Sequence, residues 1–319
     1  MKPIFELTVG NQAIISDRVM SINVVDLAGM FSDEIEIQLD DRDNAIALPP
    51  TGDQITVKLG WGGQGLVFSG RYFVDEVDVE SPPDTMKISG RAANNPQAIK
   101  AQKTRHWDDT TLGAIVSQVA SEHGYIPQVV GDIGDLQIKH LDQTDESDMH
   151  LLTRLAKEYG AVSKPVNNAW LFARPGEADS AGEKTLPVIH VKRGGDVSRI
   201  WAGKADRFKY NGARAAWHDQ EGGERRYETV GSEPIYQLRH TYKTAGEAIQ
   251  AADARRRSLS RGLGAIELTV LGNPEAAAEA QLVVSGFREG MDGEWLIKRV
   301  EHNVSGQSFT TKIEGELPQ

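Results

Sequence analysis

The glycine-rich stretch at residues 60–65 is the segment whose spacing best matches a known binding chemistry. Gly60, Gly62 and Gly65 follow the pattern G-x-G-x-x-G. That pattern binds dinucleotides when a helix follows it, because the helix N-terminus receives the pyrophosphate. Here residues 66–74 are instead typical of another strand. The sequence therefore predicts a hairpin loop and no nucleotide site.

Other residue types that could carry catalysis are absent or scattered. The chain contains no Cys, which excludes disulfides, thiolate nucleophiles and Cys-ligated metals. Its 8 His show no H-E-x-x-H or other close ligand spacing, and no G-x-S-x-G elbow occurs. The 46 Asp and Glu leave open a carboxylate pair for glycoside cleavage, but they sit mostly at alternate strand positions, as they would on a solvated face. We therefore predict no metal, no cofactor and no enzymatic site.

Two groups of carboxylates alternate with apolar residues along predicted strands, so that like charges share one face. Repulsion between such charges favours a face in contact with water. That face is either an outer surface or the wall of a wide aqueous channel. The candidate channel-lining residues are Glu34, Glu36, Asp40, Glu76, Asp78 and Glu80.

The overall charge argues against a nucleic-acid-binding protein. The chain has 35 Lys and Arg against 46 Asp and Glu, a net charge of −11, which repels a phosphate backbone unless a local basic patch exists. The one dense basic run is Arg255, Arg256 and Arg257 with Arg261. It fits either a solvated helix paired with acidic neighbours or a contact to an acidic partner subunit.

The period of the apolar residues changes along the chain. Residues 1–100 alternate with a period of two, which is typical of half-buried strands, although Asp75 falls on the apolar side of one strand. The middle has helical spacing behind residues 108–110 and over about 145–159, where Thr144 or Asp145 can cap a helix that Gly160 ends. The last third returns to strands.

One helix interrupts those last strands, beginning at the capping box of Thr244 and Glu247 and running to about residue 260. We therefore predict a mainly β protein with an α+β middle region. Two β-barrels, at 1–100 and 196–319, flank a small α/β domain at 101–195 that includes a loose loop at 176–182. The strand–turn–strand segments at 73–90 and 296–315 resemble each other, which indicates either a common hairpin type or two related barrels.

Residues 143–160 carry a motif of a known family. They read QTDESDMHLLTRLAKEYG and resemble the helix Q-x-x-E-S-D-x-x-F-L-x-R-L-A-x-x-x-G of the VgrG spike and phage late control D family, with Leu151 at the usual Phe. Residues 272–274, 295–302 and 309–314 resemble the closing pattern G-N-P, W-x-V-x-x-V-x-H and G-F-x-T-x-x-E. The Gly of the last element is displaced, since Gly306 lies three residues before Phe309. The resemblance spans essentially the whole chain.

This resemblance implies the baseplate hub of a contractile tail, in a phage or tail-like particle assembled in the bacterial cytoplasm. Such hubs are trimers at the tip of the tail tube, and two similar barrels per subunit give a pseudo-sixfold ring between a sixfold tube and a threefold spike. The motif residues are implied to be scaffold, not catalytic: Glu146, Asp148, Arg154, Gly160, Trp295 and His302. Because the chain ends at Gln319, soon after the closing motif, the spike needle is expected on a separate polypeptide.

The partners implied are a homotrimer, the tail tube protein and the spike protein, with DNA or other cargo passing through the bore and no membrane insertion. Two other functions are alternatives. The abundant carboxylates leave room for a tail-associated peptidoglycan hydrolase. A nucleic-acid regulator is opposed by the net charge and by the lack of a helix-turn-helix pattern.

Overall fold

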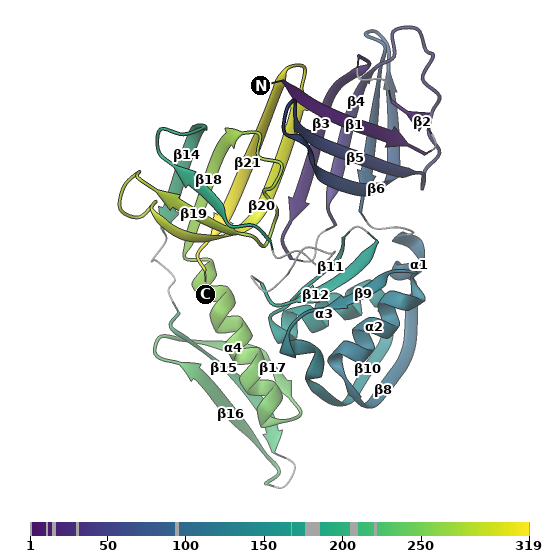
Figure 1. Ribbon diagram of the computed structural model, residues 1–319. Coiled ribbons are helices and arrows are strands. Elements are labelled where there is room, and N and C mark those ends of the chain that lie inside the picture. Colours follow the sequence, from purple (N-terminus) through teal and green to yellow (C-terminus); the bar gives the residue numbers. More distant parts are fainter. Residues whose placement is uncertain are drawn as a thin grey trace.

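The computed structural model describes residues 2–10, 12–14, 17–29, 32–92, 96–166, 168–175, 186–204, 210–219 and 222–318. A large sheet forms one end of the molecule, and a middle α/β unit and a smaller lobe lie side by side at the other end (Figure 1). The loose loop predicted at 176–182 lies outside the described residues.

The large sheet has 13 strands, and most of them follow one path. In order they are β14 (Val197–Lys204), β18 (Gly264–Leu271), β21 (Ser308–Glu316), β20 (Gly293–Ser305), β3 (Val19–Leu27), β4 (Glu34–Asp40), β7 (Thr85–Arg91), β6 (Gly65–Glu80), β5 (Gln54–Trp61), β1 (Pro3–Val9) and β2 (Gln12–Ala13). Strand β13 (Ile189–Lys192) joins β20 through β19 (Gln281–Ser285).

Strand β20 joins the two halves of the chain into this one sheet. Residues 296–305 of this 13-residue strand pair with β21 along one edge, and β20 pairs with β19 and then β3 along the other. The two closed barrels predicted from the sequence are not found, because in the described part of the chain the strand path ends at β14 and β2 without closing. The edge of β20 that a closed C-terminal barrel would need is occupied by the N-terminal strand β3.

Alternating residues half-bury these strands, as predicted. In β4, Ile35, Ile37 and Leu39 are buried and the residues between them are exposed. Strand β6 differs, because a bulge between Val74 and Glu76 reverses the alternation. Asp75 is therefore exposed and lies 3.5 Å from Arg91, so the prediction that it belongs to the apolar side is wrong.

The glycine motif at residues 60–65 forms the hairpin turn between β5 and β6, as predicted. A Cβ atom on Gly60 would lie 1.9 Å from the carbonyl oxygen of Gly65, which no side chain can tolerate. The role of these glycines is therefore to let the two strands approach closely at the turn.

The described part of the middle unit combines a long hairpin, three α-helices, a 3-10 turn and a small sheet. The hairpin joins β8 (Gln102–Thr111) and β10 (Gln137–Ser147), and the three-stranded sheet has the order β11 (Val162–Val166), β12 (Ala169–Ala173) and β9 (Ile126–Val129). The helices are α1 (Pro96–Lys100), α2 (Leu112–Glu122), the 3-10 turn η1 (Asp132–Asp135) and α3 (Asp148–Tyr159). The apolar stripes of α2 and α3 share one core with the aromatic residues of β12.

Three strands of the last third form a sheet of their own, in the order β16 (Glu224–Gly231), β15 (Gly212–Asp219) and β17 (Ile235–Tyr242). Helix α4 (Ala245–Arg261) covers one face of it with buried alanines. Its predicted cap is confirmed, because the Glu247 amide donates to Thr244 Oγ1 at 3.2 Å. This lobe contributes no strand to the large sheet, and its α4 packs against α3 of the middle unit (Figure 1).

Candidate functional site

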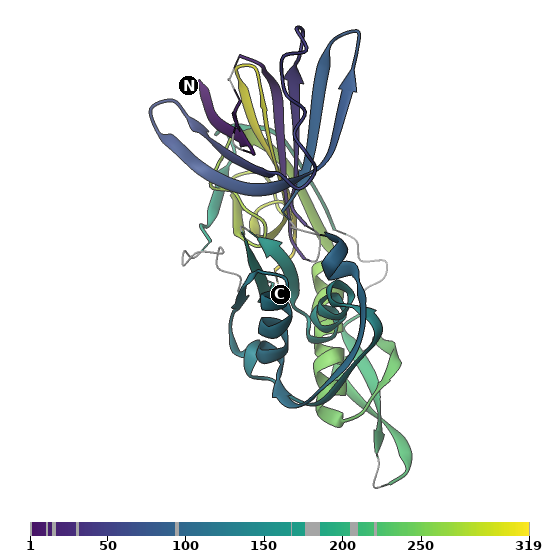
Figure 2. The same cartoon turned by 90° about the vertical axis from the view of Figure 1, so that its right-hand side faces the viewer.

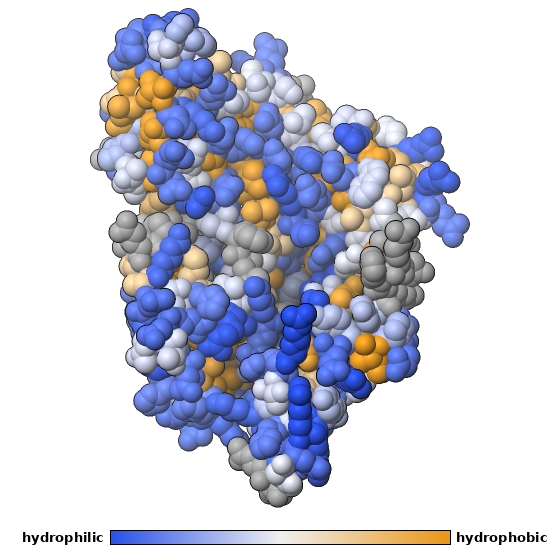
Figure 3. Space-filling view, turned by 180° about the vertical axis from the view of Figure 1, so that it is seen from behind, coloured by the Kyte–Doolittle hydropathy of each residue, from blue (hydrophilic) through white to orange (hydrophobic). Residues whose placement is uncertain are grey.

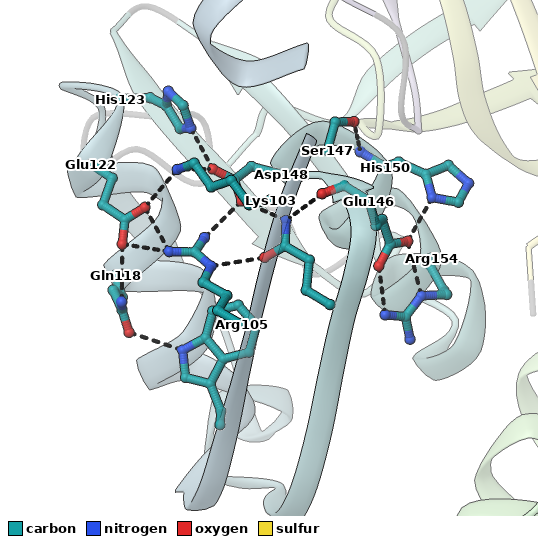
Figure 4. A network of polar contacts seen from close by, with 12 residues as sticks. Lys103, Arg105, Gln118, Glu122, His123, Glu146, Ser147, Asp148, His150 and Arg154 are labelled. Carbon is teal, nitrogen blue, oxygen red and sulfur yellow. Dashed lines mark hydrogen bonds and ion pairs between the residues drawn. The ribbon is translucent and has the colours of Figure 1, made fainter. Parts of the chain in front are cut away.

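The carboxylate of Asp148 is the centre of a polar network between α2, α3 and the long hairpin (Figure 4). The side chain is fully buried. Its Oδ2 accepts from Lys103 Nζ at 2.6 Å and from His123 Nε2 at 2.8 Å. Its Oδ1 accepts from Arg105 at 2.6 Å and from Gln143 Nε2 at 2.8 Å. Four donors thus converge on one carboxylate and fix the start of α3.

The same cations also engage Glu122 at the end of α2. Arg105 donates to both of its oxygens at 2.7 Å, and Lys103 lies 3.0 Å away. Burial raises the pKa of Asp148 and of Glu122, but the hydrogen bonds outweigh it and lower each pKa to about 2. Both groups are therefore ionised at neutral pH, so neither can serve as a general acid.

The rest of the helix motif closes α3 at both ends. Arg154 grips both oxygens of Glu146, at 2.8 and 3.0 Å, which ties the second turn of the helix to the end of β10. Ser147 caps the helix by accepting from the His150 amide at 3.2 Å, so the predicted cap at residue 144 or 145 is wrong by two or three positions. Gly160 ends the helix with a left-handed φ of 67°, as predicted.

The closing motif binds the two halves of the large sheet together. Gly272 packs against the ring of Phe309, where an added Cβ would lie 2.2 Å from Cγ, and its carbonyl accepts from Trp61 Nε1 at 2.7 Å. His302 is fully buried between Thr311 Oγ1 (3.0 Å) and the carbonyl of Ala276 (3.2 Å). Burial lowers its pKa to about 4, so it is a neutral structural group. Trp295, buried in the C-terminal core, donates to the Met291 carbonyl at 3.0 Å.

The two acidic stripes lie on one face of the large sheet, on either side of β7. Lys87 and Arg91 of β7 stand between them, with Lys87 2.9 Å from Glu36 and Arg91 3.7 Å from Glu34. The polar face continues across β3, β20, β21 and β18 through cross-strand pairs. Its further charged residues include Glu267, Arg299, Glu301, Lys312 and Glu314, and Arg199 of β14, which lies opposite Thr269. Carboxylates therefore outnumber cations across this face.

A second buried ionic cluster joins the middle unit to the large sheet. Lys164 of β11 is fully enclosed, and its Nζ donates to Asp26 (2.8 Å), Asp33 (3.0 Å) and the Leu27 carbonyl (2.6 Å). The other oxygen of Asp26 accepts from the Ala278 amide at 2.8 Å. Burial raises the pKa of Asp33 to about 7 despite the ammonium beside it. Three segments far apart in the sequence therefore meet at one lysine.

An open polar pocket of about 550 Å³ lies beside the motif helix, and Glu146, His150 and Arg154 form part of its wall. Within the described ranges, no group of three His, Asp or Glu side chains is arranged to hold a metal ion. None of the helices in that part of the chain is both long and apolar enough to cross a membrane.

The motif residues thus connect elements to each other, which is the pattern of a structural protein built around a large open sheet. The chain belongs to the phage tail baseplate hub (GPD) family, whose model matches residues 30–308. It is 30% identical to the probable baseplate hub protein of Escherichia phage P2 over 95% of this chain and 89% of that protein. The counterpart in Escherichia phage 186 is 29% identical, over 99% and 93%. In fold, the 43 kDa tail protein of prophage MuSo2 from Shewanella oneidensis matches with a TM-score of 0.73 at 17% identity, over 99% and 98%.

Sequence reasoning identified the motif carboxylates but missed the groups that neutralise them. Lys103 and Arg105 lie on β8, a strand whose two faces are both largely polar, so no apolar alternation marks it. Lys164 stands in a short strand with no distinguishing pattern. An isolated lysine among buried residues is the signal that was available, because a buried ammonium requires a carboxylate partner.

Proposed function

We propose that this protein is the structural hub of a tail baseplate in a phage or tail-like particle, and that three copies form a ring connecting the tail tube to the spike. The observation that carries the proposal is the open sheet with one polar, acid-rich face. An open sheet with free edges can be extended by further copies, and a repeated contact with a closing rotation produces a ring. On this proposal the protein resides in the virion tail.

The two candidate edges are β14 and the second half of β6. In the part of the chain described here, β14 pairs only with β18. Beyond Asp75, β6 pairs only with β7, since β5 follows β6 no further than Phe73. A large apolar side chain is exposed at each edge, with Trp201 52% and Val79 55% exposed. Figure 2 shows the long blue strand β6 curving, so its two halves run in different directions.

Ring closure through these edges would place the polar face on one continuous surface of the assembly. We infer that this surface lines the bore and includes Glu34, Glu36, Asp40, Glu76, Asp78 and Glu80. An excess of carboxylates repels a polyanion such as DNA, so cargo slides past the wall without binding to it. The motif residues serve as scaffold, because they hold the middle unit and both halves of the sheet in fixed positions.

The absence of cysteine from the chain makes the ring directly testable. Trp201 lies on the polar face of β14, opposite Glu267, and Asp78 lies on the same face of β6, opposite Lys87. We expect Trp201→Cys combined with a cysteine at position 76, 78 or 80 to form oxidised oligomers of up to three chains. Trp201→Cys with Val79→Cys is the matched control, because residue 79 points to the other face.

Native mass measurement of the unmodified protein gives an independent reading, since three chains of 34.9 kDa are expected to travel together. A persistent monomer that also fails to cross-link at all three positions would overturn the ring. The hydrolase alternative gains no support from the motif, whose carboxylates are held ionised by cations. Peptidoglycan clearing by the purified protein, abolished by one carboxylate-to-amide change, would revive it.

A further inference from the structure

One face of the small lobe presents arginines with no carboxylate among them. Helix α4 covers the face formed by Ala213, Ala215 and their neighbours, so alternate residues of β15, β16 and β17 form the opposite face. We name this opposite face the arginine face; it consists of Arg214, Ala216, His218, Arg225, Tyr227, Thr229, Gln237, Arg239 and Thr241. All of these except Ala216 are exposed.

The contacts of the three arginines are weak ones. Arg214 donates to Gln237 at 2.8 Å, and the guanidinium groups of Arg214 and Arg225 each lie 5.3 Å from the centre of the Tyr227 ring. Within the described residues, neither these two nor Arg239 forms an ion pair. Tyr227 is itself 46% exposed. The face therefore carries positive charge that no carboxylate among the described residues neutralises.

The basic run that stands out in the sequence behaves differently. Arg256 and Arg257 of α4 pair with Asp253 at 3.0 and 3.1 Å, and Arg261 pairs with Glu316 at 3.0 Å. Arg255 stacks over Tyr236 at 4.5 Å, on the covered side of the sheet. These arginines form salt bridges and ring contacts within the lobe and to β21, in agreement with the salt-bridge interpretation of this run. The cations that are free for a partner lie on the far side of the same sheet.

The charge of the lobe is opposite to that of the rest of the chain. Residues 210–261 contain nine Lys and Arg against seven Asp and Glu, a net charge of +2, which leaves −13 for the remainder. Seen from behind, a row of strongly hydrophilic side chains runs down the lower part of the molecule (Figure 3). A long polyanion such as DNA would extend beyond the lobe and meet the acidic remainder, whereas a compact acidic segment would contact the lobe alone.

We propose that the arginine face binds a carboxylate-rich segment of another tail protein. Guanidinium groups grip carboxylates through two parallel hydrogen bonds. Arg214 and Arg225 both reach the ring of Tyr227, and Arg239 lies on the adjacent strand β17, so one extended acidic segment that crosses the strands can engage all three. Arg and Tyr are also the residue types that dominate binding energy at protein interfaces. The proposal rests on the function proposed above, because it assigns the face to a partner within the particle.

The first test uses a fluorescent peptide of glutamate residues as the probe, with a short DNA duplex as a second arm. We expect the triple variant Arg214→Gln, Arg225→Gln, Arg239→Gln to bind the peptide at least about tenfold more weakly. Arg226→Gln is the matched control, because this residue of β16 points to the other face and pairs with Asp219 and Glu224. Equal peptide affinity in the triple variant, or tighter binding of the duplex than of the peptide, would overturn the proposal.

The second test uses the particle itself. Thr229→Cys places one thiol on the arginine face without removing any cation. We expect maleimide to label it in the isolated protein and not in purified tails. Lys139→Cys is the comparison site, because residue 139 is exposed on β10 and lies outside the arginine face. If the protein is in the tails and Thr229→Cys is fully labelled there, the proposed interface is wrong. If the protein is absent from the tails, the hub function itself fails.

Discussion

Two ionic clusters stabilise the middle unit, one inside it around Asp148 and one at its junction with the large sheet around Lys164, and they differ in the ratio of cations to carboxylates. Around Asp148 and Glu122, the cations Lys103 and Arg105 match two carboxylates, with His123 as a further donor. Around Lys164, a single ammonium serves both Asp26 and Asp33. Both pKa values in the first cluster are lowered to about 2. In the second, Asp33 has a pKa raised to about 7, while that of Asp26 is lowered.

The difference in ratio gives the clusters different physical behaviour. A balanced cluster stays ionised across the whole physiological range and acts as a fixed brace for α3. A cluster with one carboxylate in excess must either hold a proton or bury a net negative charge. Because Lys164 connects the middle unit to the large sheet, that proton affects how firmly the two parts are joined.

The largest expected effect comes from removing the carboxylate of Asp148, the centre of the balanced cluster. Asp148→Ala leaves the buried donors of Gln143 and His123 without their acceptor, at about 2 kcal/mol each, whereas Lys103 and Arg105 keep Glu122 as a partner, so the total loss is about 4 kcal/mol. We expect that loss in the free energy of opening of the middle unit, measured from hydrogen exchange of the α3 amides. Asp135→Ala, an exposed carboxylate of η1, is the control and should change it by less than about 0.5 kcal/mol. Similar small effects for both variants would mean that the network is not a brace.

Removing the lysine tests the unbalanced cluster. Lys164→Met leaves two buried carboxylates together, and we expect a loss of about 3 kcal/mol near neutral pH. The loss should shrink at acidic pH, because both carboxyls can then take up protons. Urea unfolding at several pH values measures it, and Lys139→Met on the exposed side of β10 is the matched control. A pH-independent loss would show that packing of the side chain, and not its charge, joins the two parts.

A substitution at Gly160, the residue that ends α3, tests two effects: backbone strain and packing against α4. Its φ is 67°, and an added Cβ would lie 2.9 Å from Cβ of Ala254 in α4. Gly160→Ala should therefore cost about 2 kcal/mol, because a left-handed conformation and a contact with the lobe are both strained. Gly124→Ala is the control for the left-handed conformation alone, since that glycine has φ 76° and open space around its Cβ position. Equal melting temperatures of the two variants would rule out the α3–α4 contact as a constraint.

The sequence predicted these elements unevenly, for identifiable reasons. The alternation in β4, the capping box of α4 and the glycine that ends α3 are local signals, and each is confirmed. Closure of the barrels and the orientation of Asp75 depend on which strand occupies an edge of β20 and on a bulge in β6, and neither leaves a local pattern. In the motif, the carboxylates were found because the family pattern marks them. Their cations were not, because Lys103 and Arg105 lie on β8, 45 and 43 residues before Asp148 in sequence, and only folding brings them to it.

The smallest expected effect is the contribution to stability of a proton on Asp33, in the cluster around Lys164. Besides Lys164 and Asp26, the ionisable groups that sense Asp33 or Asp26 electrostatically in the described structure are Tyr72 and His302. Because the pKa of Asp33 is higher in the folded protein than its ordinary value of 3.8, its contribution to stability is complete below pH 3.8 and is lost as the pH rises to about 7. Asp33→Asn cannot ionise, so this variant should gain about 1 kcal/mol relative to the parent between pH 6 and pH 8. Parallel stability curves for the two proteins over that range would show that Asp33 does not titrate there, and that a proton on this carboxyl does not set the stability of the cluster near neutral pH.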